Sequence, residues 1–564
     1  MYILGIYDGH DAGAALLEGS RILFAANEER YTRRKLEVRF PYGSIQAALR
    51  YAGLKPSDID VVAFPTLELV KFTARVMPGE QEKYYMFRRR QMPKPAHEAR
   101  YLIPKYGTTS LGIVPFSAMA NRMLMSRRIG TLGFSNAKVV GIEHHNAHAA
   151  TAAFTSGFRK ALVVTSDGYG DGLSGTISIM DRGKLERISS TSARNSLGIF
   201  YEQATHIAGM RALEDEGKIM AMADYSFPFG YESNKLKSFF SIQGTDIRAK
   251  YGGIEQYRML DRISWSMPRE QFAYMVQQVL EENISRFVGN AADEHDIGNV
   301  AMAGGTFANV KVNMRISALK SVRKPYVFPH MGDGGIAMGA AMYANYTLNG
   351  IASYRFENAY LGESYQDERL KASLSKAKGL KYWKDPEPAG HAAELIANDD
   401  YVFWFQGRAE YGPRALGNRS ILAKADSETA KGKLNVYVKH REWYQPFAPS
   451  ILKEDSRKLL SGIKGDGNFM TMCYKVRPLG INALKAVIHI DNTARAQIVG
   501  EEAGIYRNLL KRVKRILGYG AVLNTSFNVH GSPIVNTPEE AIETMRNTGT
   551  RYMFMGNYFI EAKK

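Results

Sequence analysis

Cysteine is almost absent from this sequence. The chain has one cysteine, Cys473, among 564 residues. A single cysteine excludes an intrachain disulfide and a zinc site built from several thiolates. A metal site in this chain would therefore depend on histidine and carboxylate ligands.

Long hydrophobic runs are absent as well. No uninterrupted apolar stretch reaches the roughly 18 residues that a membrane-spanning helix needs. The first residues, "MYILGIYDGHDAG", meet Asp8 after a short apolar run and lack the basic start and longer apolar core of a signal peptide. We therefore expect no membrane span and a cytoplasmic location.

Acidic residues are fewer than basic ones, which gives a net charge of +18. This excess permits nucleic acid, an anionic surface or a phosphorylated small molecule as partner, and solvated basic faces explain it equally well. The basic residues do not alternate with aromatic ones, as they do on single-strand binding platforms. We expect a small-molecule partner rather than nucleic acid, and a homodimer remains compatible with the sequence.

A pattern of strand, turn and strand occurs twice. "YILGIYDG" is followed by two strand-like runs around Glu18-Gly19-Ser20, and "ALVVTSDG" is followed by two such runs around Asp181-Arg182-Gly183. The repetition predicts an internally duplicated α/β domain. The length predicts more than one domain, and a linker-like change near residue 355 places them at 1–355 and 356–564.

Residues 71–130 interrupt the first domain with a basic segment that includes Arg88, Arg89 and Arg90. Solvated helix faces are the simpler interpretation of such a charge run. The alternative is an insertion that shapes a pocket for a substrate.

Three histidines lie close together in "EHHNAHAATAAF", residues 143–154. The alanines predict a helix, on which His144 and His148 share one face at i and i+4 while His145 points elsewhere. Asp167 and Asp333 lie in glycine-rich loops, where turn chemistry also explains an aspartate. Together the two histidines and two aspartates predict a nitrogen and oxygen site for iron(II), manganese or zinc.

Three glycine-rich turns follow strand-like runs, in "DGHDAGAA", "DGYGDGLSG" and "AGGTFAN". Such turns expose backbone N–H groups that bind phosphate oxygens. Their order resembles the two phosphate loops and the adenosine loop of the actin/hexokinase/Hsp70 (ASKHA) superfamily, and a metal beside them would bridge nucleotide phosphates.

The second domain has cations beside glycine, proline and asparagine turns. They are Arg414, Arg419, Lys439, Arg441 and Arg495, and Ser526 lies in a similar turn. Arginines in turns offer bidentate contacts to phosphate, and few carboxylates lie near them in the sequence to form surface salt bridges instead. The apolar runs before these loops predict a twisted mixed sheet that binds a small phosphorylated ligand.

Almost the whole chain resembles the NodU/CmcH family of O-carbamoyltransferases, to which tobramycin-type enzymes belong. The similar motifs are "HHNAHAA", "EGKIMAMA", "AGGTFANVKVN", "GRAEYGPRALGNRSILA", "LNVYVKHREWYQPFAPSIL", "VIHIDNTARAQIV" and "LNTSFNVHGSPIV". The resemblance implies an N-terminal domain like the tRNA-threonylcarbamoylation enzyme and a YrdC-like C-terminal domain. It also implies that carbamoyl phosphate and ATP give carbamoyl-adenylate, whose carbamoyl group passes to a hydroxyl of a small-molecule or sugar acceptor.

The resemblance implies roles for individual residues. The metal ligands are His144, His148, Asp167 and Asp333, and the implied metal is Fe(II), although another divalent ion, including Mg²⁺, remains open. The nucleotide site comprises Lys218, Gly304, Gly305 and Asn309. The carbamoyl-phosphate site comprises Arg414, Lys439, Arg495 and Ser526. His10 and His145 are the candidate catalytic residues, with His10 as the general base for the acceptor hydroxyl.

Three alternatives to this interpretation exist. An enzyme that makes threonylcarbamoyl-adenosine in tRNA would use both domain types and suit the positive charge, but the motifs "GPRALGNRS" and "QPFAPS" argue against it. A non-catalytic nucleotide-binding scaffold would not need the dense cation motifs. Hydrogenase-maturation carbamoylation is disfavoured because that family has paired-cysteine zinc motifs.

Overall fold

The computed structural model describes residues 1–92 and 112–562, so the central part of the basic insert, 93–111, lies outside the described residues. The chain divides into two compact units. The N-terminal unit comprises 1–28 and 36–356, and the C-terminal unit comprises 29–35 and 357–564. The short segment 29–35 therefore belongs to the second unit, although the sequence places it within the first domain.

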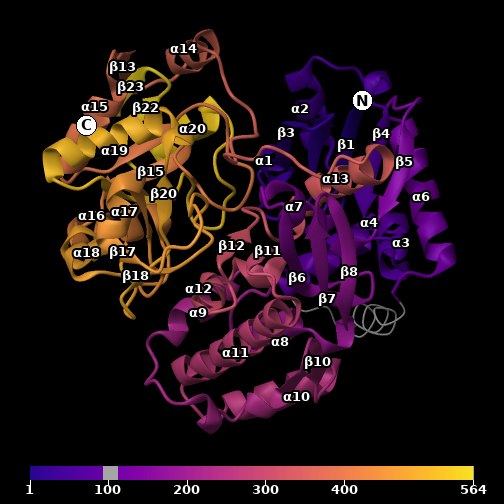
Figure 1. The fold of residues 1–564 in the computed structure, drawn as a ribbon. Coiled ribbons are helices and arrows are strands. Elements are labelled where there is room, and N and C mark those ends of the chain that lie inside the picture. The colour runs from indigo at the N-terminus through magenta and orange to yellow at the C-terminus, as the bar shows by residue number, and fades with distance from the viewer. Residues whose placement is uncertain (93–111, 563–564) are drawn as a thin grey trace. The chain divides into compact units, whose positions relative to one another are not determined.

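The N-terminal unit contains two five-stranded sheets with the same strand order (Figure 1). The first has the order β3-β2-β1-β4-β5, and the second has the order β8-β7-β6-β11-β12. The strands of the first are β1 (Tyr2–Tyr7), β2 (Gly13–Glu18), β3 (Arg21–Asn27), β4 (Val61–Pro65) and β5 (Lys138–Ile142). Those of the second are β6 (Lys160–Gly170), β7 (Leu173–Asp181), β8 (Lys184–Ser192), β11 (Asn299–Ala303) and β12 (Lys324–Val327).

The predicted duplication is confirmed by the pairing of these strands. In each sheet a central strand, β1 or β6, begins an antiparallel meander on one side and pairs in parallel with β4 or β11 on the other. The hairpin turns predicted at Gly19 and at Arg182-Gly183 are present, and all three residues have positive φ angles of 53°, 47° and 83°. Glycine adopts such angles without strain, which explains its use in both turns.

Two helices of small residues lie between the sheets. α7 (His144–Thr155) packs on β6 and β11, α13 (Ile336–Asn349) packs on β1 and β4, and the two helices pack on each other. A Cβ atom on Gly339 would lie 2.0 Å from the Ala147 carbonyl oxygen, and one on Gly5 would lie 1.9 Å from the Ala337 carbonyl oxygen. A side chain at either position would push the layers apart, so close packing explains the Ala/Gly-rich composition of this region.

Further helices cover the two sheets of the N-terminal unit (Figure 1). Beside the first sheet are α2 (Tyr42–Ala52), α3 (Leu69–Val76), α4 (Pro78–Arg88) and α6 (Pro115–Gly130). Beside the second are α8 (Leu197–Ile207), α9 (Glu216–Ala223), α10 (Gly253–Ser264), α11 (Arg269–His295), α12 (Val310–Ala318) and the hairpin β9 (Phe240–Gln243) and β10 (Asp246–Ala249). The basic insert is thus mainly helical where it is described.

The C-terminal unit is built on an eight-stranded sheet of order β13-β23-β22-β14-β15-β21-β16-β20. Both parallel and antiparallel pairs occur, so the predicted mixed sheet is confirmed. Its strands are β13 (Leu380–Lys384), β14 (Val402–Phe405), β15 (Arg419–Lys424), β16 (Ala448–Leu452), β20 (Gln497–Val499), β21 (Ala521–Ser526), β22 (Tyr552–Met555) and β23 (Tyr558–Ala562). A small sheet contains β17 (Leu460–Ser461), β18 (Tyr474–Val476) and β19 (Thr493–Ala494).

Helices complete the C-terminal unit. They are α1 (Glu29–Thr32), α14 (Asp367–Ser375), α15 (Pro388–Ala397), α16 (Glu428–Lys433), α17 (Lys453–Leu459), α18 (Pro478–Ala483), α19 (Ile505–Leu517) and α20 (Pro538–Asn547), with a π-helical turn at Leu434–Lys439. One core cluster joins α15 and α19 to the sheet through Trp404, Tyr506 and Phe554. Among the described residues of the whole chain, no helix is both long and apolar enough to cross a membrane.

Candidate functional site

Several candidate residues of the N-terminal unit lie at the carboxyl ends of strands, three parallel strands in each of the two sheets. His10, Thr66 and His144 follow β1, β4 and β5 in the first sheet, and Asp167, Gly304 and Asp333 lie at or after the ends of β6, β11 and β12 in the second. Ligand sites of α/β sheets lie at such strand ends, where loops carry free backbone groups.

Four candidate metal ligands converge there. His144, His148, Asp167 and Asp333 each place one ligand atom within 4.8 Å of all the others. The two Nε2 atoms of His144 and His148 lie 3.2 Å apart. Asp333 Oδ1 lies 3.5 Å from His144 Nε2 and 3.4 Å from His148 Nε2, and Asp167 Oδ2 lies 3.4 Å from His144 Nε2. Ligand atoms about 2.1 Å from one ion are separated by about 3–3.5 Å, so this spacing fits a metal.

Two further observations support the fit. His144 Nδ1 lies 3.1 Å from the Thr66 hydroxyl oxygen, which can accept a hydrogen bond from Nδ1–H. This places the proton on Nδ1 and leaves Nε2 free as a metal ligand. Asp333 Oδ1 is buried and has no hydrogen-bond partner among the described residues. A buried carboxylate oxygen in this condition is explained by an ion that the group would bind.

The charges of the cluster are mutually compensated. Burial lowers the pKa of His144, but Asp333 and Asp167 outweigh it and raise the value to about 10. Burial likewise opposes ionisation of Asp333, whereas His144 and His10 hold its pKa well below the usual range. Without a metal, the cluster is therefore held by ion pairs between histidine and aspartate.

A second layer fixes Asp333. The Tyr7 hydroxyl donates to Asp333 Oδ2 at 2.6 Å. Next to it, the buried Asp8 carboxylate forms ion pairs with Lys71 at 3.0 Å and with Arg75 at 2.9 Å. Lys71 also lies over the Tyr7 ring, 5.6 Å from its centroid. The end of β1 is thereby tied to α3, which belongs to the insert.

Asp171 joins three parts of the site through backbone N–H groups. Its Oδ1 accepts from Leu67 at 2.7 Å and Glu68 at 2.8 Å, and its Oδ2 accepts from His144 at 2.7 Å. Burial and the nearby Glu143 raise the pKa of Asp171 to about 6. The carboxylate thus holds the loop after β4 against the first turn of α7. Thr66, at the start of that loop, has a positive φ of 71°.

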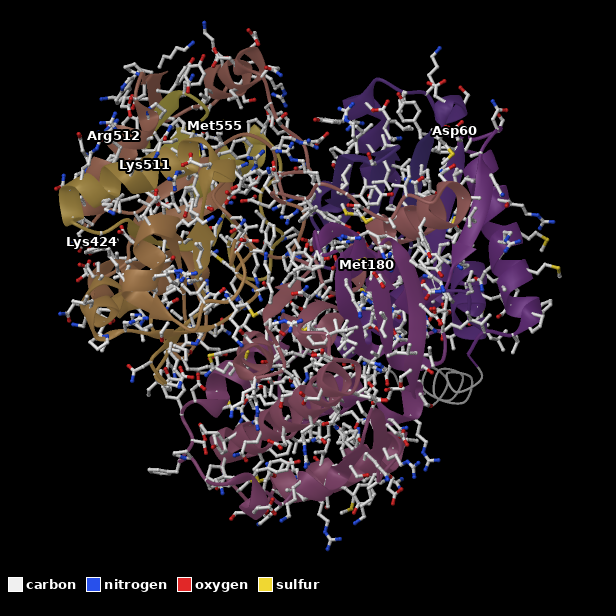
Figure 2. All side chains as sticks on the ribbon, viewed as in Figure 1. Asp60, Met180, Lys424, Lys511, Arg512 and Met555 are labelled. Atoms are coloured by element: carbon white, nitrogen blue, oxygen red, sulfur yellow. The ribbon has the colours of Figure 1, made fainter. Side chains whose placement is uncertain are left out.

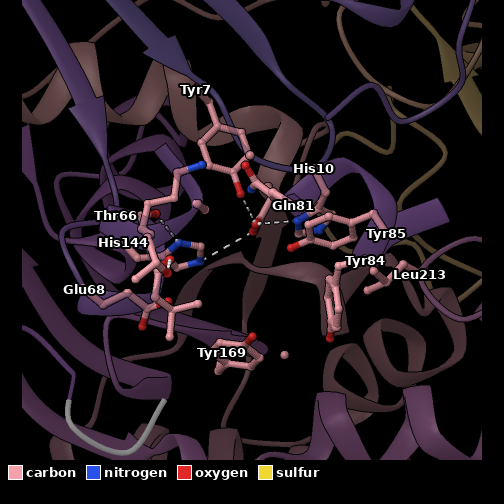
Figure 3. A pocket seen from close by; sticks show the side chains of 18 of the residues that line it. Tyr7, His10, Thr66, Glu68, Gln81, Tyr84, Tyr85, His144, Tyr169 and Leu213 are labelled. Carbon is pink, nitrogen blue, oxygen red and sulfur yellow. Dashed lines mark hydrogen bonds and ion pairs between the residues drawn. The ribbon is translucent and has the colours of Figure 1, made fainter. Parts of the chain in front are cut away.

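A cavity of about 420 Å³ lies beside the cluster (Figure 3). His10, His144, Asp167 and Asp333 all line it. His10 Nδ1 lies 3.5 Å from Asp333 Oδ2, and its ring stacks on Tyr85 with centroids 5.2 Å apart. His10 therefore presents an imidazole to the same space as the candidate metal ligands.

His145 is placed differently. It does not line the cavity, its side chain is fully buried, and its Nδ1 lies 2.8 Å from the Thr165 hydroxyl oxygen. Burial and the adjacent His144 lower its pKa to about 4. The structure thus brings His10 to the cavity and leaves His145 behind the metal ligands.

The glycine loop after β11 contacts the metal cluster directly. The Gly305 N–H donates to Asp167 Oδ1 at 2.7 Å. Gly304 has a φ of 109°, and a Cβ atom there would lie 2.1 Å from the Ser166 carbonyl oxygen. Only glycine fits between the two loops.

The other two candidate nucleotide residues have partners of their own. The Asn309 side chain caps α12 by accepting from the N–H groups of Lys311 and Val312, and it exchanges hydrogen bonds with Gln277. Lys218, on α9, pairs with Asp215 at 3.2 Å. Asn309 thus shapes the loop, and no contact places Lys218 against Gly304 or Gly305.

The arginines of the basic insert lie in different environments. Arg88 ion-pairs with Glu202 and lines the cavity, and Arg89 is buried and donates to the Leu36 carbonyl oxygen. Arg90 is exposed, and so are Arg122 and Arg127 on α6, as a solvated face requires. Of the run Arg88, Arg89 and Arg90, only Arg88 lines the cavity, in the wall formed by α3 and α4.

Part of the excess positive charge does lie on solvated faces of the C-terminal unit. Figure 2 shows Lys511 and Arg512 on α19, whose apolar residues Leu509, Leu510 and Val513 are buried. Arg512 pairs with Glu387 at 3.1 Å. This is the amphipathic pattern of an ordinary surface helix.

A second group of cations is half-buried or buried in the C-terminal unit. Burial and the neighbouring Arg495 hold the pKa of Arg414 well below its usual range, and burial and Arg441 do the same for Lys439. Burial also lowers the pKa of Arg495, whose Nε atom is buried without a hydrogen-bond partner. Among the described residues, none of these cations forms an ion pair with a carboxylate. Buried cations without such partners suit a site that binds an anion.

Lys439 and Ser526 come together in this group. Lys439 donates to the Ser526 carbonyl oxygen and, at 2.7 Å, to Asn528 Oδ1. Lys439 ends the π-helical turn, so the expectation that each cation loop follows an apolar strand is wrong here. The Arg441 guanidinium donates to the Thr525 hydroxyl at 3.0 Å and lies over the Phe447 ring.

Arg419 is not a candidate ligand. Its side chain is fully buried, donates to the carbonyl oxygens of Gln406 and Gly407, and stacks on Phe405 at 3.6 Å. The expectation that it contacts phosphate is therefore wrong, because its donors stabilise the loop that carries Arg414.

Several residues of the site were missed by sequence reasoning. Asp171 follows Asp167 in "DGYGDG", so the motif itself offered a signal. Tyr7, Thr66 and Tyr85 had none, because their positions depend on how β1, β4 and α4 meet.

Two family models match most of this chain. A family model described as the carbamoyltransferase N-terminus matches residues 2–342, and one described as the carbamoyltransferase C-terminus matches residues 393–562. The chain belongs to the carbamoyltransferase family. The protein is therefore a transferase, and the predicted NodU/CmcH-type membership is confirmed.

Two relatives and one solved structure are similar to this carbamoyltransferase. Nodulation protein NolNO of Sinorhizobium fredii is 29% identical and covers 98% of this chain and 79% of its own. The 3'-hydroxymethylcephem-O-carbamoyltransferase of Streptomyces clavuligerus is 34% identical over 43% of this chain and 44% of its own. The structure of full-length HypF in a phosphate- and nucleotide-bound form has 15% identity and a TM-score of 0.37, and covers 62% of this chain and 56% of that chain.

Proposed function

We propose that this carbamoyltransferase is an ATP-dependent O-carbamoyltransferase that uses carbamoyl phosphate as donor and a hydroxyl group as acceptor. One observation carries the proposal. His10, His144, Asp167 and Asp333 line one cavity, His10 lies 3.5 Å from Asp333, and a glycine loop is hydrogen-bonded to the metal-ligand cluster through Gly305 and Asp167. Such an arrangement suits activation of a nucleotide-linked carbonyl beside a base for a hydroxyl.

The two units have distinct proposed roles. The duplicated strand order of the N-terminal unit supports an ASKHA-type nucleotide- and metal-binding domain that performs the transfer. The mixed sheet and half-buried cations of the C-terminal unit support a YrdC-like domain that binds carbamoyl phosphate. The corresponding ranges are 1–355 and 356–564, with the insert 71–130 in the first.

In the C-terminal unit, Arg414, Lys439, Arg495 and Ser526 would bind the phosphate group of the donor. Hydrolysis of carbamoyl phosphate releases inorganic phosphate and carbamate, and a carbamate oxygen then attacks the α-phosphorus of ATP. Carbamoyl-adenylate forms and pyrophosphate leaves. When the phosphate group of the donor binds, the cations form charge-assisted hydrogen bonds with it, and these offset the repulsion between the cations.

In the N-terminal unit, the acceptor hydroxyl oxygen attacks the carbamoyl carbon and AMP leaves. His10 Nε2 accepts the hydroxyl proton, and Asp333 orients the ring through Nδ1, which lies 3.5 Å from Asp333 Oδ2. Gly304 and Gly305 would let this loop approach the nucleotide phosphates closely, because neither residue has a side chain. Asn309 shapes the loop, and Lys218 joins the proposed nucleotide site through its motif. His145 supports His144 rather than transferring a proton, because it does not line the cavity.

His144, His148, Asp167 and Asp333 would hold the metal, for which the family resemblance implies Fe(II). When bound, the metal supplies positive charge that stabilises the developing negative charge on the nucleotide and the carbonyl oxygen. The two histidines and two carboxylates suit a divalent ion of this kind.

Threonylcarbamoylation of tRNA is the alternative function. The match of both halves of the chain to carbamoyltransferase models argues against it, as does a cavity with more carboxylates than cations. A requirement for tRNA with a steep salt dependence would favour it.

The test needs no acceptor. Purified protein is incubated with Fe(II), ATP and carbamoyl phosphate, and carbamoyl-adenylate and pyrophosphate are measured by mass spectrometry. We expect both products from the wild type, a loss of at least about 100-fold in Arg495→Ala, and no change in the matched surface variant Arg512→Ala. Intact ATP with metal bound would contradict the proposed donor chemistry.

A further inference from the structure

The segment 29–35 comes from the N-terminal half of the sequence but belongs to the C-terminal unit. Arg30, in the short helix α1, is only 6% exposed. Arginine is rarely buried unless its donors have partners. The partners of Arg30 therefore indicate what the segment does in this unit.

Arg30 joins two loops of the C-terminal unit with the two arms of one guanidinium. Nη2 donates to the Gly412 carbonyl oxygen at 3.2 Å, and Nη1 donates to the Ile534 carbonyl oxygen at 3.0 Å. The guanidinium is planar and its donors form a rigid fork, so the positions of the two carbonyl groups are fixed relative to each other.

The first loop carries Arg414, which follows Gly412 by two residues. Gly412 has a φ of 131°, which residues with a side chain rarely adopt. Further along the loop, the Leu416 N–H donates to Glu410 Oε1 at 2.7 Å. The loop is therefore held on both sides of Arg414, by Arg30 before it and by Glu410 after it.

The second loop leaves β21 at Ser526 and ends near Ile534. The Val535 N–H donates to the Phe527 carbonyl oxygen at 2.9 Å, which ties the end of the loop to its beginning. Lys439 donates to the Ser526 carbonyl oxygen. A contact at Ile534 therefore also helps to fix Ser526 and the ammonium group beside it.

The cations of the two loops form one group. Burial is the main cause of the lowered pKa values of Arg414, Arg441 and Lys439. Arg495 adds to this effect for Arg414 and Arg441, and Arg441 adds to it for Lys439. Charges shift one another's pKa over short distances, so the arginine of the first loop and the lysine held by the second suit a single anion.

Arg33 offers a comparison within the same segment. It donates to the carbonyl oxygens of Ile534 and Pro533, each at 2.9 Å, and pairs with Glu540 at 3.0 Å. Among the described residues, its hydrogen bonds reach the second loop and not the first. Arg33 therefore stabilises one loop, whereas Arg30 connects two.

We propose that Arg30 is a positioning residue of the carbamoyl-phosphate site. It holds the two loops at the separation at which their cations bind one phosphate group. Because Nη1 and Nη2 already donate to carbonyl oxygens, Arg30 orders the site and is not another phosphate ligand. This inference rests on the proposed function, and it adds to the donor site a residue from outside the C-terminal half of the sequence.

The test uses the full-length protein and needs no acceptor. Isothermal titration calorimetry measures the dissociation constant of inorganic phosphate on the metal-free protein. Pyrophosphate formation gives kcat and the KM values for carbamoyl phosphate and ATP. For Arg30→Ala we expect the phosphate dissociation constant and KM for carbamoyl phosphate to rise by at least about tenfold, with KM for ATP changed by less than about twofold. A purely structural role would lower kcat through loss of active enzyme and leave both KM values unchanged.

Matched variants separate the clamp from general effects of an arginine. Arg30→Lys keeps the charge but loses the fork, so it should raise KM for carbamoyl phosphate by about threefold. Arg33→Ala should raise it less than Arg30→Ala does, because only the second loop is loosened. Arg551→Ala, at an exposed arginine that pairs with Glu561 at 2.9 Å, should change nothing. Added guanidinium should restore part of the phosphate affinity of Arg30→Ala.

Thermal unfolding checks that the variants are folded, and Arg30→Lys keeps the test decisive if Arg30→Ala is not. Unchanged KM for carbamoyl phosphate in the folded variants would overturn the inference, as would equal rises in both KM values or equal effects of Arg30→Ala and Arg33→Ala. A wild type that binds neither inorganic phosphate nor carbamoyl phosphate would reject the donor site and this inference with it. Phosphate binding that depends on Arg30, without carbamoyl-adenylate formation, would reject only the donor chemistry.

Discussion

The histidine–aspartate cluster of the N-terminal unit and the cation group of the C-terminal unit handle charge in opposite ways. In the first, Asp333 and Asp167 lie 3.4–3.5 Å from histidine nitrogens, and each charge has a partner of opposite sign. In the second, burial lowers the pKa of Arg414, Lys439 and Arg495, and none of the three has a carboxylate partner among the described residues. Neighbouring cations add to this effect, Arg495 for Arg414 and Arg441 for Lys439.

The difference indicates what each site requires. A compensated cluster is already ordered, and a cation only replaces the protons of its histidines. A group of like charges that is partly buried costs stability until an anion binds. Substitution of a metal-binding residue should therefore lower both metal affinity and protein stability at the first site. Substitution of a cation at the second site should lower anion binding without lowering stability.

Of the substitutions considered, Asp333→Asn should have the largest effect on metal binding, activity and stability at the first site. The substitution removes the charge that pairs with His144, His148 and His10, and it takes away the main partner that raises the pKa of buried His144. We expect metal content to fall below detection, activity to fall by about 1,000-fold, and unfolding free energy to fall by about 3 kcal/mol. Elemental analysis and urea unfolding measure these changes.

The matched control for that experiment is Asp246→Asn, an exposed hairpin residue, which should behave as the wild type. Retention of stoichiometric iron by Asp333→Asn would remove Asp333 from the ligand set.

Arg414→Ala should show that the second site contributes to ligand binding and not to stability. Without added anion, we expect the unfolding free energy to stay the same or rise slightly, since repulsion with Arg495 is relieved. Carbamoyl phosphate at 100 times its wild-type dissociation constant should stabilise the wild type by about 2.7 kcal/mol and the variant by less than about 1 kcal/mol. Thermal and urea unfolding with and without the ligand measure both quantities.

Arg515→Ala on the exposed side of α19 serves as the control and should retain the full stabilisation. A marked loss of stability in Arg414→Ala without ligand would show that this guanidinium is structural, as Arg419 is.

Asp171→Asn should weaken the first site without touching a ligand. An Asn amide nitrogen cannot accept a hydrogen bond, so the N–H of His144 or those of Leu67 and Glu68 would lose their acceptor. We expect metal affinity to fall by about tenfold, as for other groups that orient a ligand, with the metal stoichiometry unchanged at saturation. Titration of the metal-free protein with Mn²⁺ measures this affinity, and Asp181→Asn in the nearby hairpin is the control.

Glu216→Gln should have the smallest effect and should depend on pH. Burial raises the pKa of Glu216 to about 7 from its usual value near 4.5. The folded protein therefore loses stability as pH rises from about 4.5 to 7, because the unfolded chain ionises this group first. Since the side chain is only partly buried, we expect the variant to gain about 1 kcal/mol over the wild type at pH 8 and nothing at pH 4.5.

The Gln side chain can still accept the Leu213 N–H that Glu216 binds at 2.6 Å, so the helix start is preserved. Urea unfolding at the two pH values decides the prediction, and an equal gain at both would show that the effect is not electrostatic.

Much of the fold followed from local patterns. The helix at 144–155, the hairpins at Gly19 and Gly183 and the duplication were predicted because helix propensity, turn residues and strand alternation act over a few residues. The convergence of His144, His148, Asp167 and Asp333 was expected from their motifs, and their placement at strand ends agrees with it.

The failures have one physical cause. Arg419 and Arg88 were judged by their neighbours in the sequence, but their environments depend on distant residues, Phe405 and Gln406 for one and Glu202 for the other. Charge type is a property of the sequence, whereas desolvation and pairing are properties of packing.

The sequence by itself determined the strand and helix pattern, the duplicated unit, the ligand types available and the exclusion of disulfide or multi-thiolate chemistry, since each depends on composition or short-range periodicity. Only the tertiary structure decided that Asp171 binds three backbone N–H groups, that His10 rather than His145 faces the cavity, and that tyrosines of the insert stand beside the metal ligands. These features join residues up to several hundred positions apart, and the glycines that let α7 and α13 pack between the sheets set the distances that make such contacts possible.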